Sequence, residues 1–219
     1  MQQKFPALVI TCEHASNAVP RFLMNIPKEA LESHRGYDIG AYGVYRRLVR
    51  RLHPDFYIAG KFSRLVIDLN RSENHPDILS EYSRELKGFT RDRIFKIWKR
   101  HHDAVESFVA KAVANAEAQG EGLDAPCVIH LGIHSFTPVL NNVVRNADIG
   151  ILYDPARAWE AQVATSIIKE IQARAPGLKI RRNYPYLGKS DGLTTSLRKK
   201  YGTAYVGIEI EINQKLFLG

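Results

Sequence analysis

The sequence predicts an α/β fold, in which a mixed sheet lies between helices on both faces in three layers. Two observations predict it. Short apolar runs of strand length alternate with longer stretches whose apolar residues recur at helical spacing, which is typical of βα units rather than β-meanders. The chain has 219 residues, of which 45% are hydrophobic and 25% charged, enough to bury one complete sheet. We therefore expect a single domain over residues 1–219.

The strands are expected where apolar runs are short and bounded by turn residues. Seven runs qualify, at residues 7–12, 56–59, 64–69, 127–131, 149–152, 179–182 and 204–211. Each is four to eight residues long, the usual length of a strand in a globular protein.

The helices are expected between these runs. Apolar residues recur at helical spacing in 39–52 and 94–113, which predicts two amphipathic helices. Asp154 followed by Pro155 indicates a capped helix start, and the helix is expected over 158–173. The stretches that lack either period are expected to be loops, namely 72–88, 120–126 and 183–192. In an open α/β sheet, ligands bind beyond the carboxyl ends of strands, so residues just past each strand are candidates for function.

Charge and cysteine content limit the class of protein. A net charge of +8 fits either a nucleic-acid binder or an enzyme that attracts anionic substrates. The basic residues follow helical faces without any nucleic-acid-binding motif, so we expect a small anionic substrate and no nucleic acid. Cys12 and Cys127 are too few for a disulfide framework, the N-terminus lacks a signal-peptide pattern, and no apolar run reaches membrane-spanning length. A cytoplasmic protein with no membrane partner is expected, and the pattern carries no information on oligomeric state.

Histidines follow two of the predicted strands. His14 lies two residues after the run 7–12, and His134 lies three residues after the run 127–131. Two neutral imidazoles with one oxygen ligand are what a zinc hydrolase uses to hold its metal, with one position left open for water. The pattern therefore predicts a Zn²⁺ site at His14 and His134.

The third ligand is expected to be Asp38, although an aspartate before a helix is also what an N-cap looks like. Glu13 is an alternative, but as the neighbour of His14 it is expected to point elsewhere. Asn17 occupies the place that a His-x-x-Glu motif would give to a carboxylate, and its amide is a poor zinc ligand.

Two carboxylates end the last predicted strand. Glu209 and Glu211 are two residues apart and therefore face the same way, on a strand that is otherwise apolar. Repulsion and burial raise the pKa of such a pair toward what a general base needs. One of them is expected to be the base, unless the strand is an edge strand whose polar face meets water.

Basic and amide side chains border the run 64–69. Arg64 begins it, and Asn70 with Arg71 follows it. Guanidinium groups bind carboxylates in a bidentate manner, so these residues are candidates for holding an acidic substrate. The alternative is a structural ion pair with Asp68.

Taken together, the motifs resemble the N-formylglutamate amidohydrolase family. The residues that carry the resemblance are 13–17 with Pro20, 35–41, 63–71, 134–138 and 183–186. A more distant likeness runs to aspartoacylase and succinylglutamate desuccinylase, through Asp-Leu-Asn-Arg at 68–71 and Gly-x-Glu at 207–209. The resemblance implies the zinc exopeptidase-like fold, also described as phosphorylase/hydrolase-like, and an enzyme of histidine degradation.

The same resemblance implies a role for each site residue. His14 and His134 are implied as zinc ligands, and Glu209 rather than Glu211 as the base. Arg64, Asn70 and Arg71 are implied as carboxylate-binding residues, with Tyr186 closing one side of the pocket.

We therefore expect a zinc-dependent amidohydrolase that cleaves an N-acylated acidic amino acid, with N-formylglutamate giving formate and glutamate. Two alternatives stay open: a related zinc metallo-peptidase or cell-wall amidase, and a noncatalytic binding protein on the same fold. Lys189 follows Gly188 where the family resemblance implies a second glycine, so the substrate loop leaves the identity of the acyl amino acid open.

Overall fold

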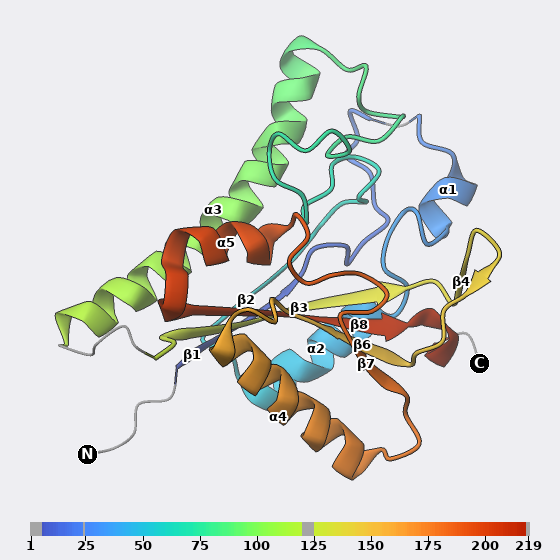
Figure 1. The fold of residues 1–219 in the computed structure, drawn as a ribbon. Helices are drawn as coiled ribbons and strands as arrows, with labels where there is room; N and C mark the ends of the chain where they lie inside the picture. Colours follow the sequence, from blue (N-terminus) through green and yellow to red (C-terminus); the bar gives the residue numbers. More distant parts are fainter. Residues whose placement is uncertain (1–5, 24, 120–124, 218–219) are drawn as a thin grey trace.

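The computed structural model describes residues 6–23, 25–119 and 125–217, and its centre is a six-stranded sheet (Figure 1). The strand order is β2-β1-β3-β8-β6-β7. The strands are β1 (Ala7–Cys12), β2 (Phe56–Ala59), β3 (Val128–Phe136), β6 (Ile149–Leu152), β7 (Ile180–Arg182) and β8 (Tyr205–Asn213). The first four strands in this order are parallel, whereas β6 runs antiparallel to β8 and parallel to β7. The sheet is mixed, as predicted.

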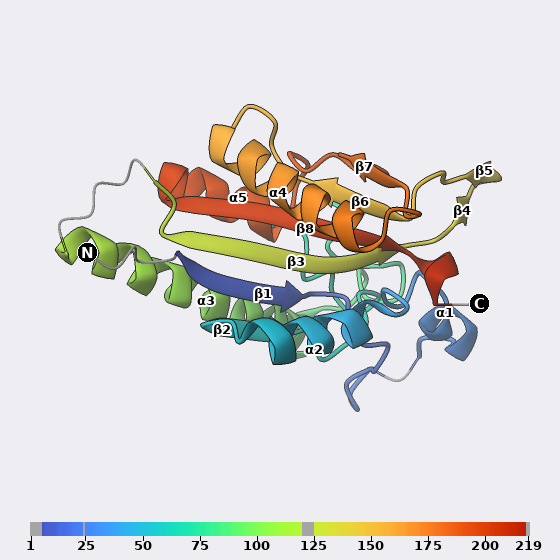
Figure 2. The same cartoon turned by 90° about the horizontal axis from the view of Figure 1, so that it is seen from below.

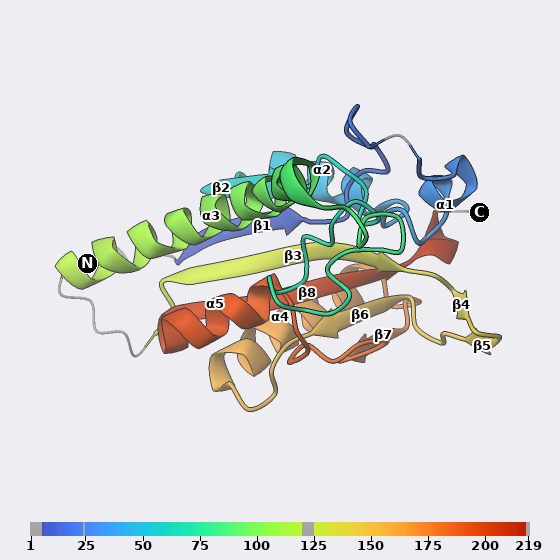
Figure 3. The ribbon, with the colours of Figure 1, turned by 90° about the horizontal axis from the view of Figure 1, so that it is seen from above.

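Helices cover both faces of the sheet. On one face lie α2 (Ala41–Leu52) and α4 (Ala158–Arg174), which stand in front of the strands in Figure 2. On the opposite face lie α3 (Gly88–Ala118) and α5 (Leu193–Tyr201), as Figure 3 shows. Alternate residues of β1 enter different cores, because Ile10 packs in the cluster of α2 and Val9 in that of α3 and α5. The predicted three-layer arrangement is confirmed.

The prediction of a strand at 64–69 is wrong, whereas the other six predicted strands are present. These residues form turns instead, and their apolar side chains fill a separate core with α3, including Leu65, Val66 and Ile94. Hydrogen bonds to other loops satisfy the backbone in place of a sheet, for example from Asp68 N to Ile78 O at 2.9 Å. An apolar run shows that a segment is buried, but it does not show that a neighbouring strand is present.

Several boundaries also differ from the prediction. β3 continues to Phe136, so His134 lies inside the strand rather than after it. α4 begins at Ala158 without a side-chain cap, and Asp154 instead accepts a hydrogen bond from Ala156 N in the preceding turn. Residues 120–124 of the predicted loop 120–126 lie outside the described residues.

Four short elements were not predicted. They are α1 (Lys28–Glu32), the hairpin of β4 (Val139–Leu140) and β5 (Val143–Val144), and α5. The hairpin turns at Asn141 and Asn142, whose φ angles of 50° and 61° suit asparagine in a two-residue turn. Two short 3-10 helices, Gly202–Ala204 and Gln214–Leu216, flank β8. Among the described helices, none combines the length and apolar character that crossing a bilayer requires.

Candidate metal centre

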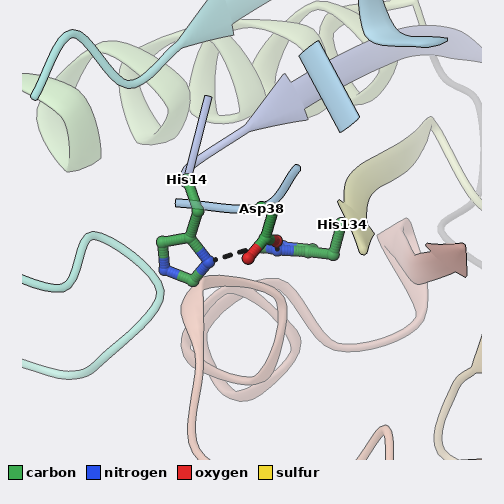
Figure 4. A group of neighbouring side chains, drawn as sticks. All are labelled: His14, Asp38 and His134. Atoms are coloured by element: carbon green, nitrogen blue, oxygen red, sulfur yellow. Dashed lines mark hydrogen bonds and ion pairs between the residues drawn. The ribbon is translucent and has the colours of Figure 1, made fainter. Parts of the chain in front are cut away.

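Three buried side chains converge where β1 and β3 end. The Nδ1 atoms of His14 and His134 lie 3.4 and 2.9 Å from Oδ2 of Asp38. One donor atom from each of the three residues lies within 4.8 Å of the other two. Donor atoms bound to one tetrahedral zinc ion at about 2.0–2.1 Å are themselves about 3.3 Å apart. Figure 4 shows the two rings with the Asp38 carboxylate between them.

The sheet and one loop hydrogen bond position these residues. β1 and β3 are parallel neighbours, so their carboxyl ends, and with them His14 and His134, meet at the same edge. The segment that carries Asp38 is attached there, because Asp38 N donates to His14 O at 3.0 Å and Ser135 N donates to Asp38 Oδ2 at 3.2 Å. Asp38 is not the N-cap of α2, since Gly40 occupies that position.

A second carboxylate lies behind each imidazole. Nε2 of His14 is hydrogen-bonded to Oδ1 of Asp68 at 2.6 Å, and Nε2 of His134 lies 3.0 Å from Oε2 of Glu13. When a cation occupies Nδ1, a carboxylate beside Nε2 holds the ring proton on that side, which leaves the lone pair of Nδ1 for the cation. This is the arrangement by which proteins orient histidines that bind metals.

The charges around the two rings suit a divalent cation. Glu13, Asp38 and Asp68 are buried carboxylates, and Arg64 is the guanidinium that pairs with Asp68 at 2.6 Å and Asp38 at 3.6 Å. Together with Arg64, these three carboxylates carry a net charge of −2 around the two rings.

The pKa values of these groups follow from the same contacts. Burial opposes ionisation of Asp38, but the neighbouring His14 and His134 outweigh it and lower the pKa of the carboxyl. Burial likewise opposes protonation of His134, but contacts with Asp38 and Glu13 raise its pKa well above the usual value. The imidazoles therefore attract a cation, whether a proton or a metal, and the donor set fits zinc.

All eight residues predicted for the site line one cavity of about 220 Å³. They are His14, Asp38, Arg64, Asn70, Arg71, His134, Tyr186 and Glu209. Glu211, Ser190, Asp191 and Leu187 also line it, whereas Asn17 is not among its lining residues. Their assigned roles stay predictions, but their convergence from six distant segments is a property of the fold.

The two carboxylates of β8 face this cavity in different surroundings. Glu209 pairs in register with Gly132, and it accepts hydrogen bonds from Asn70 Nδ2 at 3.2 Å and Thr194 Oγ1 at 3.3 Å. Glu211 is deeper, and its Oε2 has no hydrogen-bond partner among the described residues. Burial and the nearby carboxylates of Asp38 and Glu209 raise the pKa of Glu211 to about 8, although the neighbouring His134 opposes this rise.

The two arginines that were predicted to bind a substrate carboxylate also differ in their ion pairs. Arg64 is engaged with Asp68 and Asp38, so the structural alternative weighed for it is present in the fold. For Arg71, no carboxylate within residues 6–23, 25–119 or 125–217 lies at ion-pair distance. Arg71 is therefore the cation that is available for an anionic ligand in this cavity.

Tyr186 reaches the cavity from the loop between β7 and α5. Gly150 of β6 permits the close approach of this loop, because a Cβ atom there would lie 1.8 Å from Tyr184 O. Tyr186 is 45% exposed, which fits a side chain at the rim.

Sequence reasoning did not identify the contacts that three residues make at the site. Asp68 was considered as a partner of arginine, yet it also contacts His14. Glu13 was weighed as a ligand, yet it lies between His134 and His101, at 3.0 and 3.5 Å. Arg145 lines a second cavity next to the first one, and it follows a hairpin whose sequence carries no strong pattern. All three depend on tertiary contacts that no local spacing reveals.

The fold and the site can be compared with known proteins. The family model described as N-formylglutamate amidohydrolase matches residues 6–218. A solved gene product of Agrobacterium tumefaciens is 26% identical with a TM-score of 0.75, covering 98% of this chain and 83% of that one. A solved N-formylglutamate amidohydrolase from Ralstonia eutropha JMP134 has the same fold at 19% identity and a TM-score of 0.63, covering 98% and 84%. A comparison with curated proteins gives no match.

Proposed function

Because the chain belongs to the N-formylglutamate amidohydrolase family, we propose that it is a zinc-dependent enzyme that hydrolyses the amide bond of an N-acylated acidic amino acid. The proposed substrate is N-formylglutamate, which would give formate and glutamate. One observation carries the proposal: Nδ1 of His14 and of His134 meet Oδ2 of Asp38, with a buried carboxylate behind each ring.

His14, Asp38 and His134 would hold the metal. When bound, zinc supplies a Lewis acid that lowers the pKa of water toward about 7 and polarises an amide carbonyl. Glu13 and Asp68 keep both rings oriented, and Arg64 holds Asp68 and Asp38 in turn. Because these groups are fixed before a ligand arrives, little reorganisation is required during the reaction.

Glu209 is proposed as the general base that takes a proton from water and returns it to the leaving nitrogen. The hydrogen bonds from Asn70 and Thr194 fix the direction of its carboxylate. Glu211 lies deeper, and no hydrogen bond from a described residue fixes the direction of its Oε2. This difference supports the choice that the family resemblance suggested.

Arg71 is proposed to bind the α-carboxylate of the substrate. This carboxylate is two bonds from the scissile nitrogen, so it must lie in the cavity that contains the metal ligands, which Arg71 also lines. Asn70 borders the same space while it holds Glu209. A volume of about 220 Å³ is below the range of about 300–1,000 Å³ for drug-sized ligands, which favours a small amino-acid derivative over a peptide.

The test combines metal analysis with an assay of formate release. We expect about one zinc ion per chain and chelator-sensitive hydrolysis of N-formylglutamate that returns when zinc is added back. We expect His134→Ala to lose both zinc and activity.

Other outcomes distinguish the alternatives. Zinc with hydrolysis of peptides alone would favour a metallo-peptidase or cell-wall amidase. Absence of both metal and hydrolysis after zinc addition would favour a noncatalytic binding protein.

A further inference from the structure

Arg145 is a buried arginine close to the candidate active site. It follows β5 and is 9% exposed. Its Nη1 donates a hydrogen bond to Tyr186 Oη at 3.2 Å, and its guanidinium lies 5.1 Å from the centre of the Tyr186 ring and 5.8 Å from that of Phe136. Arg145 N also donates to Pro138 O at 2.8 Å, so the backbone is fixed as well.

The charge of Arg145 is not balanced by the protein. No carboxylate of the described chain forms an ion pair with it, although buried charges are normally paired. Two aromatic rings and one hydroxyl group compensate the cation in part. A guanidinium placed in this way has donors left for an anion, and its planar shape matches a carboxylate.

The surroundings of Arg145 are also positive. It lines a cavity of about 200 Å³ together with His34, Arg35 and Arg64. Arg35 is already paired with Glu81, and Arg64 with Asp68, so Arg145 is the uncompensated cation of the three. Burial and the nearby guanidinium groups, Arg145 among them, lower the pKa of His34, which agrees with a positive potential here.

This second cavity adjoins the metal cavity. Asp38, Arg64, Ser135 and Tyr186 line both of them. Arg71 lines the metal cavity but not the second one, whereas Arg145 lines the second but not the first. The site therefore offers two separate cationic positions, with the metal ligands in the cavity that holds Arg71.

We propose that Arg145 binds the side-chain carboxylate of the substrate and so makes the enzyme selective for N-acyl derivatives of dicarboxylic amino acids. This inference rests on the proposed function and deepens it. In such a substrate the α-carboxylate is two bonds from the scissile nitrogen, whereas the side-chain carboxylate of a glutamate is four bonds away. The nearer group meets Arg71 beside the metal ligands, and the farther group extends past Tyr186 into the adjoining cavity.

The test compares N-formylglutamate with N-formylglutamine, which replaces the side-chain carboxylate by a neutral amide of the same shape. We expect Arg145→Gln to lower kcat/KM for N-formylglutamate by about 100-fold, the loss of a charge-assisted hydrogen bond, and to change kcat/KM for N-formylglutamine by less than about threefold. Arg145→Lys, which keeps the charge, is expected to retain part of the preference. Equal losses on both substrates would overturn the proposal.

Arg181→Gln is the matched control, because Arg181 is exposed and stacks 4.0 Å from the centre of the Tyr184 ring outside both cavities. It removes an arginine from a tyrosine ring and is expected to leave the preference unchanged. Calorimetry with glutarate and butyrate adds a readout that needs no turnover. We expect the zinc-loaded wild type to bind glutarate at least about tenfold more tightly than butyrate, and Arg145→Gln to lose that difference.

The outcomes separate the two proposals. If the wild type fails to hydrolyse N-formylglutamate yet shows the Arg145-dependent preference for glutarate, the proposed substrate is wrong and the dicarboxylate site stands. If the wild type hydrolyses N-formylglutamate and Arg145→Gln keeps its preference for this substrate over N-formylglutamine, the inference about Arg145 is wrong and the proposed function stands.

Discussion

Replacing Glu13 by glutamine tests whether the carboxylate behind His134 strengthens metal binding. Glu13 Oε2 lies 3.0 Å from Nε2 of His134, and a metal on Nδ1 would lie across the ring, about 7 Å from this carboxylate. At an effective dielectric constant of about 20, a unit negative charge attracts a divalent ion at that distance by about 5 kcal/mol. Relaxation reduces this value, and outer-sphere substitutions typically cost about 10–100-fold in metal affinity. We therefore expect Glu13→Gln to bind zinc about 100-fold more weakly than the wild type, at the upper end of this range.

The assay is competition for zinc between the protein and a chelator of known affinity, with thermal unfolding measured in parallel. Glu160→Gln is the control, because Glu160 is also fully buried and paired, with Arg198 at 2.7 Å, but does not line the metal cavity. Both variants are expected to unfold at lower temperature, and Glu13→Gln alone to bind zinc more weakly. Wild-type zinc affinity in Glu13→Gln would refute the reasoning and leave Glu13 with a structural role.

Two further predictions concern proton transfer and pH. We expect Glu209→Gln to retain zinc and lose about 10²–10⁴-fold in kcat, whereas Glu211→Gln keeps most activity; the reverse pattern would make Glu211 the base. Burial of His130, which is hydrogen-bonded to Thr11 and Tyr205, lowers its pKa to about 4. Since the unfolded histidine takes up its proton near pH 6.5, the free energy of unfolding falls as pH drops toward 4, by about 2 kcal/mol between pH 7 and 5. Urea unfolding at both pH values should show that the free energy of unfolding of His130→Asn falls by about 2 kcal/mol less than that of the wild type. An equal fall in both proteins would disprove the assignment of this pH dependence to His130.

The predictable part of the fold was the part that local periodicity encodes. Six strands were located because each is a short apolar run bounded by turn residues, and β1 and β2 match their predicted limits. The segment 64–69 has the same composition, yet it packs into the core of α3 and the N-terminal loops. Burial alone produced that pattern, and whether a partner strand is present depends on the rest of the chain.

For the site, the residues at strand ends could be predicted from the sequence, but their long-range contacts could not. His14 and His134 follow from the rule that carboxyl ends of parallel neighbours share an edge, and the His14, Asp38 and His134 cluster confirms that they converge. The contacts of Glu13 with His134 and of Arg145 with Tyr186 span more than forty residues each, and sequence spacing carries no sign of them.

Each histidine of the metal centre is held by residues from other segments of the chain, so the geometry of the centre depends on several segments at once. Glu13 is the sequence neighbour of His14, yet it contacts the other histidine, while His14 is held by Asp68 from a distant loop. Asp38 contacts both rings, and its backbone is bonded to His14. Each imidazole is therefore oriented by a segment that does not carry it, so neither ring keeps its direction unless all the segments are in place. A site built in this way is preorganised by the fold itself, because the same contacts that join the loops also aim both Nδ1 atoms at one point.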